Sequence, residues 1–370
     1  MSIVINIFIS YKGVTMQRCN DTKAKPLRHR TVEPLCRCTV EPLILSMIKN
    51  LIRPVNLLAS GYSYLNSSIK HNPEIKGMPV SISMELTNNC NLHCPQCSSG
   101  SGQMTRPRGF MDTGLFNKVM IELSPYLYTV NLYFQGEPML HPQFFTFIHN
   151  CHVPQKVVST NGHFLSMENS DQIIKSGLSR LIVSLDGTDQ ETYSAYRVNG
   201  NLEKVVEGLK NVTQARKKYG SSLKIELQFL VNKLNEHQIP MIKQLASNVK
   251  AALKLKSMQI INDSDFGSLL PTKKLFRRYK MKGGSYVIKN SLPDRCARLW
   301  FNPVVTWDGK VVPCCFDKNA EYILGDLKTD SFREIWEGTK YRIFRKSILT
   351  GRNMIEMCRN CTSGLRGVRY

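Results

Sequence analysis

The 370-residue sequence contains no run of about eighteen or more apolar residues, so it offers no candidate for a transmembrane helix. The opening segment, residues 1–14, is apolar but lacks a basic beginning and a small-residue cleavage site, which argues against a secretory signal. Acidic residues are scarce: 28 Asp and Glu stand against 50 Lys and Arg, giving a formal net charge of +22. No aromatic-interleaved RNA-binding motif accompanies the basic excess, so the charge alone does not indicate a nucleic-acid partner.

The basic excess is concentrated near the end of the chain. Residues 271–370 hold 21 Lys and Arg against 9 Asp and Glu. We favour a solvated basic surface as the explanation. The alternative is attraction for an anionic substrate or for an acidic reductant such as flavodoxin or ferredoxin.

The 12 cysteines are not spread at loop-like intervals. Most of them fall into two tight sets, at 90–97 and at 296–361. Such clustering favours metal or cluster ligation in a reducing compartment, the cytoplasm, over a disulfide framework. Of the rest, Cys151 is expected to be a buried apolar residue.

The sequence divides into four segments. Residues 1–46 show no sustained period and are expected to be an unpacked tail, with Met47 as an alternative start. Residues 47–80 are interpreted as a helical lead-in to a core domain at 81–270. Residues 271–370 form a small cysteine-rich α+β domain.

The core segment alternates short apolar strands with helices. Strands are predicted at 81–87, 128–134, 156–160, 180–186, 223–231 and 255–261. This alternation indicates an α/β fold with a parallel sheet, a partial (β/α)6 barrel of the TIM type. Polar groups follow several strands and would converge at their carboxyl ends, where such folds place their sites. These groups are Asn88-Asn89-Cys90, Gln135-Gly136-Glu137, Asn161-Gly162 and Asp186-Gly187.

The last segment begins with a hairpin pattern. Two short strands flank Asp308-Gly309, a strong turn sequence. A helix is predicted from Ser331 to about Lys346, with Glu334 completing a capping box. Because this segment is too small for a large core, a metal staple would explain its stability.

Cys90, Cys94 and Cys97 make the most informative motif, C-x₃-C-x₂-C. Thiolates are soft ligands suited to iron–sulfur clusters, and three ligands leave one iron of a four-iron cluster open. A zinc site completed by a distant residue such as Cys151 or His93 is the alternative.

In a loop after the first strand of a β/α repeat, this motif resembles that of the radical S-adenosylmethionine (SAM) superfamily. The resemblance implies that SAM binds the open iron and is cleaved to a 5′-deoxyadenosyl radical. Gly136-Glu137-Pro138 resembles the family's GGEP-type segment, with Glu137 accepting a hydrogen bond from the SAM ammonium. By the same resemblance, Ser184 would contact SAM and Arg197 would pair with its carboxylate; a surface arginine is the alternative for Arg197.

One residue departs from the family pattern. The position before the third cysteine is usually aromatic or large and apolar, near the adenine, but here it is Gln96. Cluster binding would be unaffected, whereas the adenine contact is in question.

The second cysteine set resembles the twitch domain, a shortened SPASM domain that carries an auxiliary four-iron cluster. The implied ligands are Cys296, Cys314, Cys358 and Cys361, with Cys314 preferred over Cys315 because it directly follows Pro313. A tetrahedral zinc site is again the alternative.

The leading hypothesis is a radical SAM oxidoreductase that dehydrogenates a small, anionic or sugar-like substrate with help from the auxiliary cluster. The resemblance to twitch-bearing dehydrogenases supports this hypothesis. Modification of a peptide or protein is the second hypothesis. An iron–sulfur redox carrier or a nucleic-acid-binding protein is the third, but a carrier has no need of the Gly136-Glu137 motif. No residue is assigned as the substrate's acid or base.

Overall fold

The computed structural model describes residues 37–361, with side chains from residue 51 onward. The chain divides into two compact units, Met1–Ser46 and Met47–Tyr370, and the following description concerns the second. The predicted tail, residues 1–46, lies outside the described residues as far as residue 36. Helix α2 (Arg37–Lys70) begins inside that predicted tail and covers most of the predicted lead-in.

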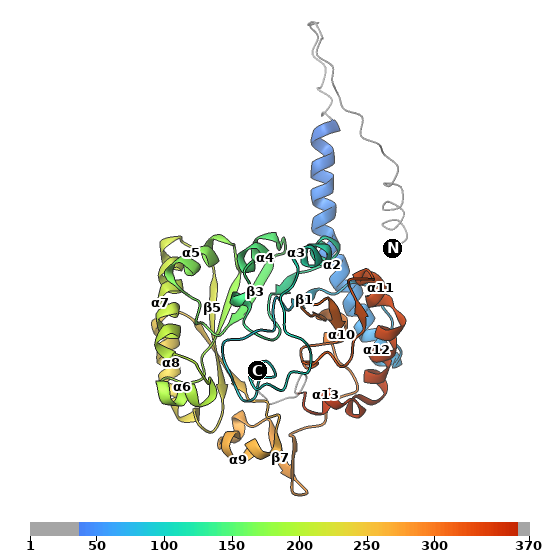
Figure 1. Ribbon diagram of the computed structural model, residues 1–370. Helices are drawn as coiled ribbons and strands as arrows, with labels where there is room; N and C mark the ends of the chain where they lie inside the picture. The colour runs from blue at the N-terminus through green and yellow to red at the C-terminus, as the bar shows by residue number, and fades with distance from the viewer. Residues whose placement is uncertain (1–36, 362–370) are drawn as a thin grey trace, which may run out of the picture. The chain divides into compact units, whose positions relative to one another are not determined.

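Within residues 37–361, six parallel strands follow one another across the sheet in sequence order, and each is followed by at least one helix (Figure 1). The strands are β1 (Ser81–Met84), β2 (Thr129–Asn131), β3 (Gln155–Thr160), β4 (Arg180–Ser184), β5 (Lys224–Val231) and β6 (Ala252–Ser257). This arrangement confirms the predicted α/β class and the partial (β/α)6 architecture. Only β6 is displaced from its predicted range, 255–261. Met258 and Ile260 gave that range the apolar pattern of a strand, but they are buried in the loop that follows β6.

The predicted hairpin is present, and it extends the core sheet. β9 (Val304–Val305) pairs in parallel with β1, with Val305 opposite Met84. β10 (Lys310–Val312) returns antiparallel to β9, and β11 (Gly325–Asp326) forms the edge. Gly309 turns the hairpin with φ +90°, a conformation that favours glycine. The hairpin therefore shares its sheet with the core, while residues 279–282 and 285–288 of the C-terminal segment form a separate two-stranded antiparallel sheet.

Helices cover the outer face of the sheet (Figure 1). They are α3 (Thr113–Leu123), α4 (Phe144–Asn150), α5 (Met167–Lys175), α6 (Gln190–Tyr196), α7 (Leu202–Lys218) and α8 (Ile239–Asn248). Ser166 and Asn201 cap α5 and α7 by accepting a backbone N–H.

The sheet has one apolar face and one polar face. Fully buried apolar side chains on the outer face join the helices in a single core; they include Ile82, Val130, Val158, Leu181 and Leu227. The alternate positions form the inner face, and many of them are polar: Ser83, Asn131, Ser159, Arg180, Ser184, Glu226, Gln228, Lys254 and Lys256. Parallel sheets are usually apolar on both faces. A polar inner face suits contact with a polar molecule.

The C-terminal segment combines helices with short strands. The predicted helix from Ser331 to about Lys346 is two helices, α11 (Phe332–Glu337) and α12 (Thr339–Gly351). Gly338 separates them in an extended conformation, and the predicted capping box at Ser331 is present. Short elements complete the segment: α9 (Phe266–Leu269), β7 (Tyr279–Lys282), β8 (Ser285–Ile288), α10 (Arg298–Phe301) and α13 (Glu356–Arg359).

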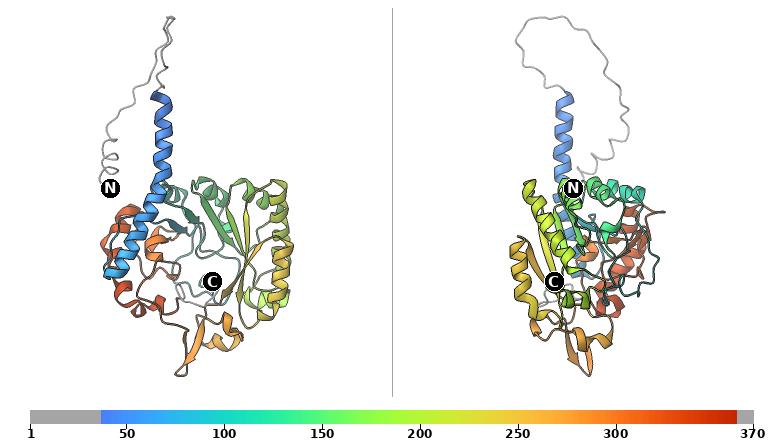
Figure 2. Two further views of the ribbon diagram at one scale, coloured as in Figure 1. Left: turned by 180° about the vertical axis from the view of Figure 1, so that it is seen from behind. Right: turned by 60° about the vertical axis from the view of Figure 1, so that its left-hand side comes forward.

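From residue 51 onward, α2 packs against the C-terminal segment, as the rear view shows (Figure 2). Tyr64 meets Trp300 edge to face at 5.6 Å, and His71 contacts the carbonyl of Leu349 at 2.8 Å. Although α2 has 34 residues, no helix among the described residues is long and apolar enough to cross a membrane.

A buried ion pair joins β1 to the C-terminal segment. Arg106 binds both carboxylate oxygens of Glu85, one of them at 2.7 Å, and donates from Nε to the carbonyl of Lys318 at 2.9 Å. The two side chains are only 9% and 0% exposed. Burial raises the pKa of Glu85, although Arg106 lowers it. Without Arg106, the buried carboxylate of Glu85 would be costly to keep ionised.

We expect Arg106→Leu to lower the free energy of unfolding by about 3–5 kcal/mol, because Glu85 would remain buried without a counter-charge. The matched control is Arg333→Ala, which removes an exposed pair with Glu337 and should cost less than about 1 kcal/mol. Urea unfolding at constant pH measures both. Equal midpoints for the two variants would show that the buried pair is unimportant.

Candidate functional site

The first cysteine loop, residues 88–100, follows β1. Cys94 is 5% exposed, and Cys90 and Cys97 are half-buried. The loop is shaped by short-range bonds: Leu92 N–H points to Cys90 Sγ at 3.5 Å, and Cys97 N–H donates to the carbonyl of Cys94 at 3.2 Å. All three cysteines pack in one apolar cluster with Leu92 and Tyr196. The structure thus brings the predicted triad together.

The environment of these thiols is dry and close to other charged groups. Burial raises the pKa of Cys90 to about 11, and Glu137 and the other two thiols add to the rise. Burial also raises the pKa of Cys94, while the guanidinium of Arg197 opposes it from 3.8 Å. Such thiols become ligands only by exchanging a proton for a metal, so metal binding there is strongly coupled to proton release.

The donor set, three thiolates on one loop, fits an iron–sulfur cluster by its chemistry. Among residues 51–361, no three Cys, His, Asp or Glu side chains are grouped to hold one metal ion. A four-iron cluster instead takes each thiolate on a different iron, and three soft donors on one loop suit it.

Gly136 brings the loop after β2 against the first cysteine loop. Its φ is +73°, and a Cβ at this position would lie 2.6 Å from the carbonyl oxygens of Thr87 and Asn89. Its N–H donates to Ser99 Oγ at 3.1 Å, and the next N–H, of Glu137, donates to the Asn89 carbonyl at 2.7 Å. Only glycine fits this close approach of two backbones.

The carboxylate of Glu137 joins the ends of β2 and β3. It is 1% exposed and accepts from Met139 N–H, Thr160 Oγ1 and Asn161 N–H, the last at 2.7 Å. Burial raises the pKa of Glu137 to about 7, although these bonds lower it. Asn161 in turn donates to Asn91 Oδ1 at 2.8 Å, which ties the network to the cysteine loop.

Arg197 ends α6 and is held by a residue that the sequence analysis did not assign. Its Nε donates to Asp186 Oδ2 at 2.6 Å, and its Nη1 lies 3.8 Å from Cys94 Sγ. Burial would lower the pKa of Arg197, but the charges of Asp186 and Cys94 outweigh burial and raise the pKa above its usual value. Asp186 is itself 1% exposed and accepts from Leu230 N–H at 2.6 Å. Ser184, two residues earlier, is half-buried at the end of β4.

The second cysteine set also converges. Cys314, Cys358 and Cys361 are buried, and Cys296 is half-buried. Arg352 Nη2 lies 3.4 Å from Cys361 Sγ; burial would lower the pKa of Arg352, but the charges of Cys296, Cys361 and Cys358 raise it. Burial raises the pKa of Cys314 well above its usual range, and Cys296 and Cys361 add to the rise.

Cys315 occupies a different position from its neighbour. It is half-buried, and Arg298 Nη1 lies 3.4 Å from its sulfur. The charge of Cys315 is the largest cause of the raised pKa of Arg298. Cys314 is the more deeply buried of the two thiols, and its preference as a ligand stays a prediction.

The arginines near these thiols were missed by sequence reasoning. Arg298 and Arg352 belong to the basic excess that we attributed to a solvated surface. Arg352 is only 2% exposed. Their proximity to cysteine in sequence, two residues after Cys296 and six before Cys358, was the available indication.

Both cysteine sets are fastened to the same short backbone segment after β6. Gln96 accepts from the N–H of Ile261 at 2.7 Å and donates to Asp265 at 2.5 Å. Asn360, between Cys358 and Cys361, donates to the carbonyl of Ile260 at 2.9 Å. Gln96, the departure from the family pattern, therefore has a structural role.

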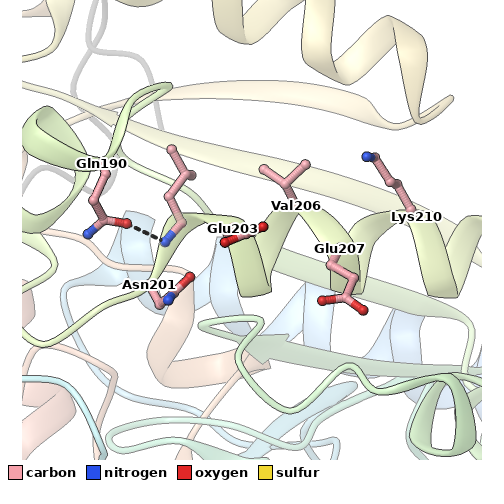
Figure 3. Close-up of a pocket in the computed structure, with 7 residues that line it drawn as sticks. Gln190, Asn201, Glu203, Val206, Glu207 and Lys210 are labelled. Carbon is pink, nitrogen blue, oxygen red and sulfur yellow. Dashed lines mark hydrogen bonds between the residues drawn. The ribbon is translucent and has the colours of Figure 1, made fainter.

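A surface hollow lies elsewhere, beside the start of α7 (Figure 3). Its lining contains two acidic residues and a lysine but no cysteine: Gln190, Asn201, Leu202, Glu203, Val206, Glu207 and Lys210. The bond from Leu202 N–H to Gln190 Oε1, 2.8 Å, closes one end. Nothing in this lining matches the chemistry of the cysteine loops.

Two family models match the chain. That of the radical SAM superfamily matches residues 84–242, and that of SPASM, an iron–sulfur cluster-binding domain, matches residues 296–362. The first range holds the first cysteine loop and the polar groups after the strands. The second holds the whole second cysteine set.

Several known proteins are similar over most of their length. The cofactor-modifying protein of tungsten-containing aldehyde ferredoxin oxidoreductase from Pyrococcus furiosus is 25% identical over 75% of this chain and 86% of its own. The AdoMet-dependent heme synthase of Methanosarcina barkeri is 24% identical over 72% and 84%. The S-adenosyl-L-methionine-dependent 2-deoxy-scyllo-inosamine dehydrogenase of Niallia circulans is 22% identical over 76% and 92%.

Among solved structures, Streptococcus suis SuiB bound to S-adenosylmethionine has the same fold. The TM-score is 0.58 at 11% identity, over 80% of this chain and 75% of SuiB. SuiB bound to its precursor peptide SuiA gives a TM-score of 0.57 over 97% of this chain and 81% of SuiB, also at 11% identity.

We expect Gly136→Ala to destabilise the protein more than Gly102→Ala. Both glycines have positive φ, but an added Cβ meets two carbonyl oxygens at Gly136 and nothing within 4 Å at Gly102. Gly102→Ala should cost about 1 kcal/mol for its backbone conformation, and Gly136→Ala clearly more. Thermal unfolding compares the two. Equal losses would mean that the approach of the two loops is not tight.

Proposed function

The chain belongs to the radical SAM superfamily and carries a C-terminal SPASM domain, and we propose that it dehydrogenates a small, polar, anionic or sugar-like substrate. Enzymes of this kind use SAM and four-iron clusters. When bound, these groups would supply an electron for the cleavage of SAM, a radical that takes a hydrogen atom from a substrate carbon, and an acceptor for the second electron as a proton leaves.

We propose Cys90, Cys94 and Cys97 as the ligands of the SAM-binding cluster. Their common loop, their burial and the nearby positive charge of Arg197 support this assignment. The cation favours the thiolate form that a metal requires, whereas burial opposes it by raising the pKa of the thiols.

We assign the auxiliary cluster to Cys296, Cys314, Cys358 and Cys361. Arg352 supports this assignment, because a guanidinium among several thiolates offsets the negative charge of a ligated cluster. Arg298 adds a second positive charge on the side of Cys315.

Four other residues are proposed to bind SAM. Gly136 gives the backbone access to the cluster loop, and Glu137 offers a buried carboxylate for the SAM ammonium. Ser184 stands at the end of β4 as a polar contact. Arg197 already pairs with Asp186, so it would reach the SAM carboxylate only while sharing its guanidinium.

The polar inner face of the sheet carries the proposal of a small polar substrate. The pKa of Tyr133 is raised to about 12, chiefly by burial. The charges of Cys315 and Glu226 add to the rise, and the charge of Arg298 opposes it. The inner face of the sheet and the second cysteine set thus lie within electrostatic reach of the same side chain. A polar molecule between them could hydrogen-bond to the strands and pass an electron to the auxiliary site.

The basic surface supports an acidic reductant such as flavodoxin or ferredoxin. The many reduced thiols support a reducing compartment, so we propose a cytoplasmic location.

Anaerobically reconstituted protein is expected to hold about eight irons in two four-iron clusters. Replacing Cys90, Cys94 and Cys97 together by alanine should remove about half of the iron and sulfide and abolish SAM cleavage. Cys151→Ala is the control, because this buried cysteine contacts Met120 Sδ at 3.9 Å and belongs to neither set. Unchanged iron in the triple variant would refute the ligand assignment.

The function is tested by separating cleavage of SAM from oxidation of substrate. Under dithionite, a panel of sugars, cyclitols and sugar acids is compared with peptides for stimulation of 5′-deoxyadenosine release. Stimulation and a two-electron oxidised product with a polar small molecule support the dehydrogenase. Stimulation by peptides alone would contradict it in favour of peptide modification.

With an active substrate, Cys358→Ala/Cys361→Ala should still release 5′-deoxyadenosine but form no oxidised product, because the substrate radical has no electron acceptor. Circular dichroism must first show that the variant remains folded, since a cluster stabilises its ligand segment. Product formation at the parent rate would reduce the second cysteine set to a structural staple.

A further inference from the structure

Between residues 51 and 69, helix α2 buries its polar side and exposes its apolar side. Four polar side chains face the body of the protein and are at most 6% exposed: Asn56, Ser60, Ser63 and Ser67. Seven large apolar or aromatic side chains are 42–77% exposed: Leu51, Val55, Leu57, Leu58, Tyr62, Leu65 and Ile69. A helix on the surface of a protein normally has the opposite arrangement, with its apolar side facing the core.

Hydrogen bonds hold α2 in this orientation. Asn56 donates to the carbonyl of Met78 at 3.0 Å and accepts from the N–H of Met78 at 2.8 Å. Ser60 Oγ donates to the same carbonyl at 2.8 Å. Ser63 and Ser67 accept backbone N–H groups of the connection to β1, each at 2.8 Å. A rotation of α2 that buried its apolar side would leave these polar groups without their partners, so the exposure of the apolar side is fixed by the fold.

Six of the exposed side chains follow one another at alternating intervals of four and three residues: Leu51, Val55, Leu58, Tyr62, Leu65 and Ile69. We call these six residues the α2 seam. The alternation is the a/d pattern of a coiled coil, in which the apolar row of one helix packs against the apolar row of another. At 1.5 Å per residue the seam is about 27 Å long. A row this narrow is typical of contact with one other helix.

The α2 seam carries no charge. Arg53 is the one charged residue between residues 51 and 69, and its guanidinium is turned to the body, where it donates to two carbonyls just after α3 at 2.9 and 3.2 Å. Lys76 Nζ lies 4.6 Å from the centre of the Tyr62 ring, but it is paired with Glu74 at 2.8 Å. Helices that bind membrane surfaces are rich in exposed Lys and Arg beside their apolar face, and these residues of α2 lack them.

A second copy of α2 matches the seam better than any other described helix does. Within residues 51–361, no other α-helix carries more than one large exposed apolar side chain. Two α2 seams have the same length and chemistry and can pair around a twofold axis, the commonest symmetry of homo-oligomers. Two chains with a net charge of +22 each repel one another, and an uncharged surface is where they can approach most easily. Two helices of this length bury on the order of 1,000 Å² together, the size at which specific interfaces begin.

We propose that α2 is a dimerisation helix, whose seam packs against the α2 seam of a second copy of this chain. The two helices form a short coiled coil. The inference is independent of the proposed function, because no residue of the seam belongs to either cysteine set or to the polar groups that follow the strands.

The test uses the full chain, anaerobically reconstituted, in analytical ultracentrifugation over a range of protein and salt concentrations. We expect a particle of two chains, each of 42.2 kDa, whose dissociation constant does not rise with salt because the contact is apolar. Leu58→Glu/Tyr62→Glu should raise the dissociation constant at least about a hundredfold, since two apolar contacts are lost and like charges meet. Met241→Glu, at a similarly exposed position on α8, is the matched control and should dimerise as the parent does.

A mixture of two variants identifies the contacting surface. Leu58→Lys/Tyr62→Lys should also be monomeric, whereas its mixture with the Glu variant should form dimers through opposite charges across the seam. If a double variant does not retain the circular dichroism of the parent, Leu65→Glu and Leu65→Lys take the place of the pair, at a position that is 60% exposed. A mixture that stays monomeric overturns the contact between two seams.

Two further outcomes overturn the proposal. The first is a parent protein that is monomeric at every concentration. Sedimentation with phosphatidylcholine vesicles and removal of residues 1–36 then show whether a membrane or that segment covers the seam instead. The second is a dimer that persists in the Glu variant, because its interface would lie elsewhere.

Discussion

The arrangement of the site depends on one stretch of backbone, Ile260–Ile261, to which both cysteine sets are attached. Gln96 binds it from the first cysteine loop and Asn360 from the second set, each through a side-chain amide. Tyr279 bonds to the same backbone and to Asn360, which closes the network. Because buried amide bonds are costly to leave unmade, this segment fixes the relative position of two loops more than 260 residues apart.

The sheet serves as both scaffold and lining. Its outer face joins the helices in one core, whereas its inner face carries polar residues from all six of the strands β1 to β6. Pairing of β9 with β1 brings the C-terminal hairpin onto the same sheet, so the segment needs no large core of its own. The buried pair of Glu85 and Arg106 reinforces this junction from the side of the first cysteine loop. Scaffold and auxiliary domain are therefore one packed body.

The positions of the basic side chains also depend on the tertiary structure. Part of the basic excess, which the sequence analysis attributed to a solvated surface, is buried, at Arg278, Arg345 and Arg352. Cations next to thiols stabilise their ionised form. The role of each basic side chain therefore depends on where it lies in the fold, and a count of charges in the sequence cannot reveal that position.

The sequence by itself determined the strand order, the parallel sheet, the hairpin at Gly309 and the grouping of cysteines, because these follow from local periodicity, turn chemistry and short spacing. It also placed Gly136 and Glu137 at strand ends, although the ligand roles of all these residues stay predictions. Only the tertiary structure decided that Gln96 and Asn360 meet one backbone segment, that Asp186 holds Arg197, and that the hairpin extends β1. Each of these contacts joins residues whose proximity depends on how the whole chain packs, and no local pattern specifies the partner of a buried polar side chain.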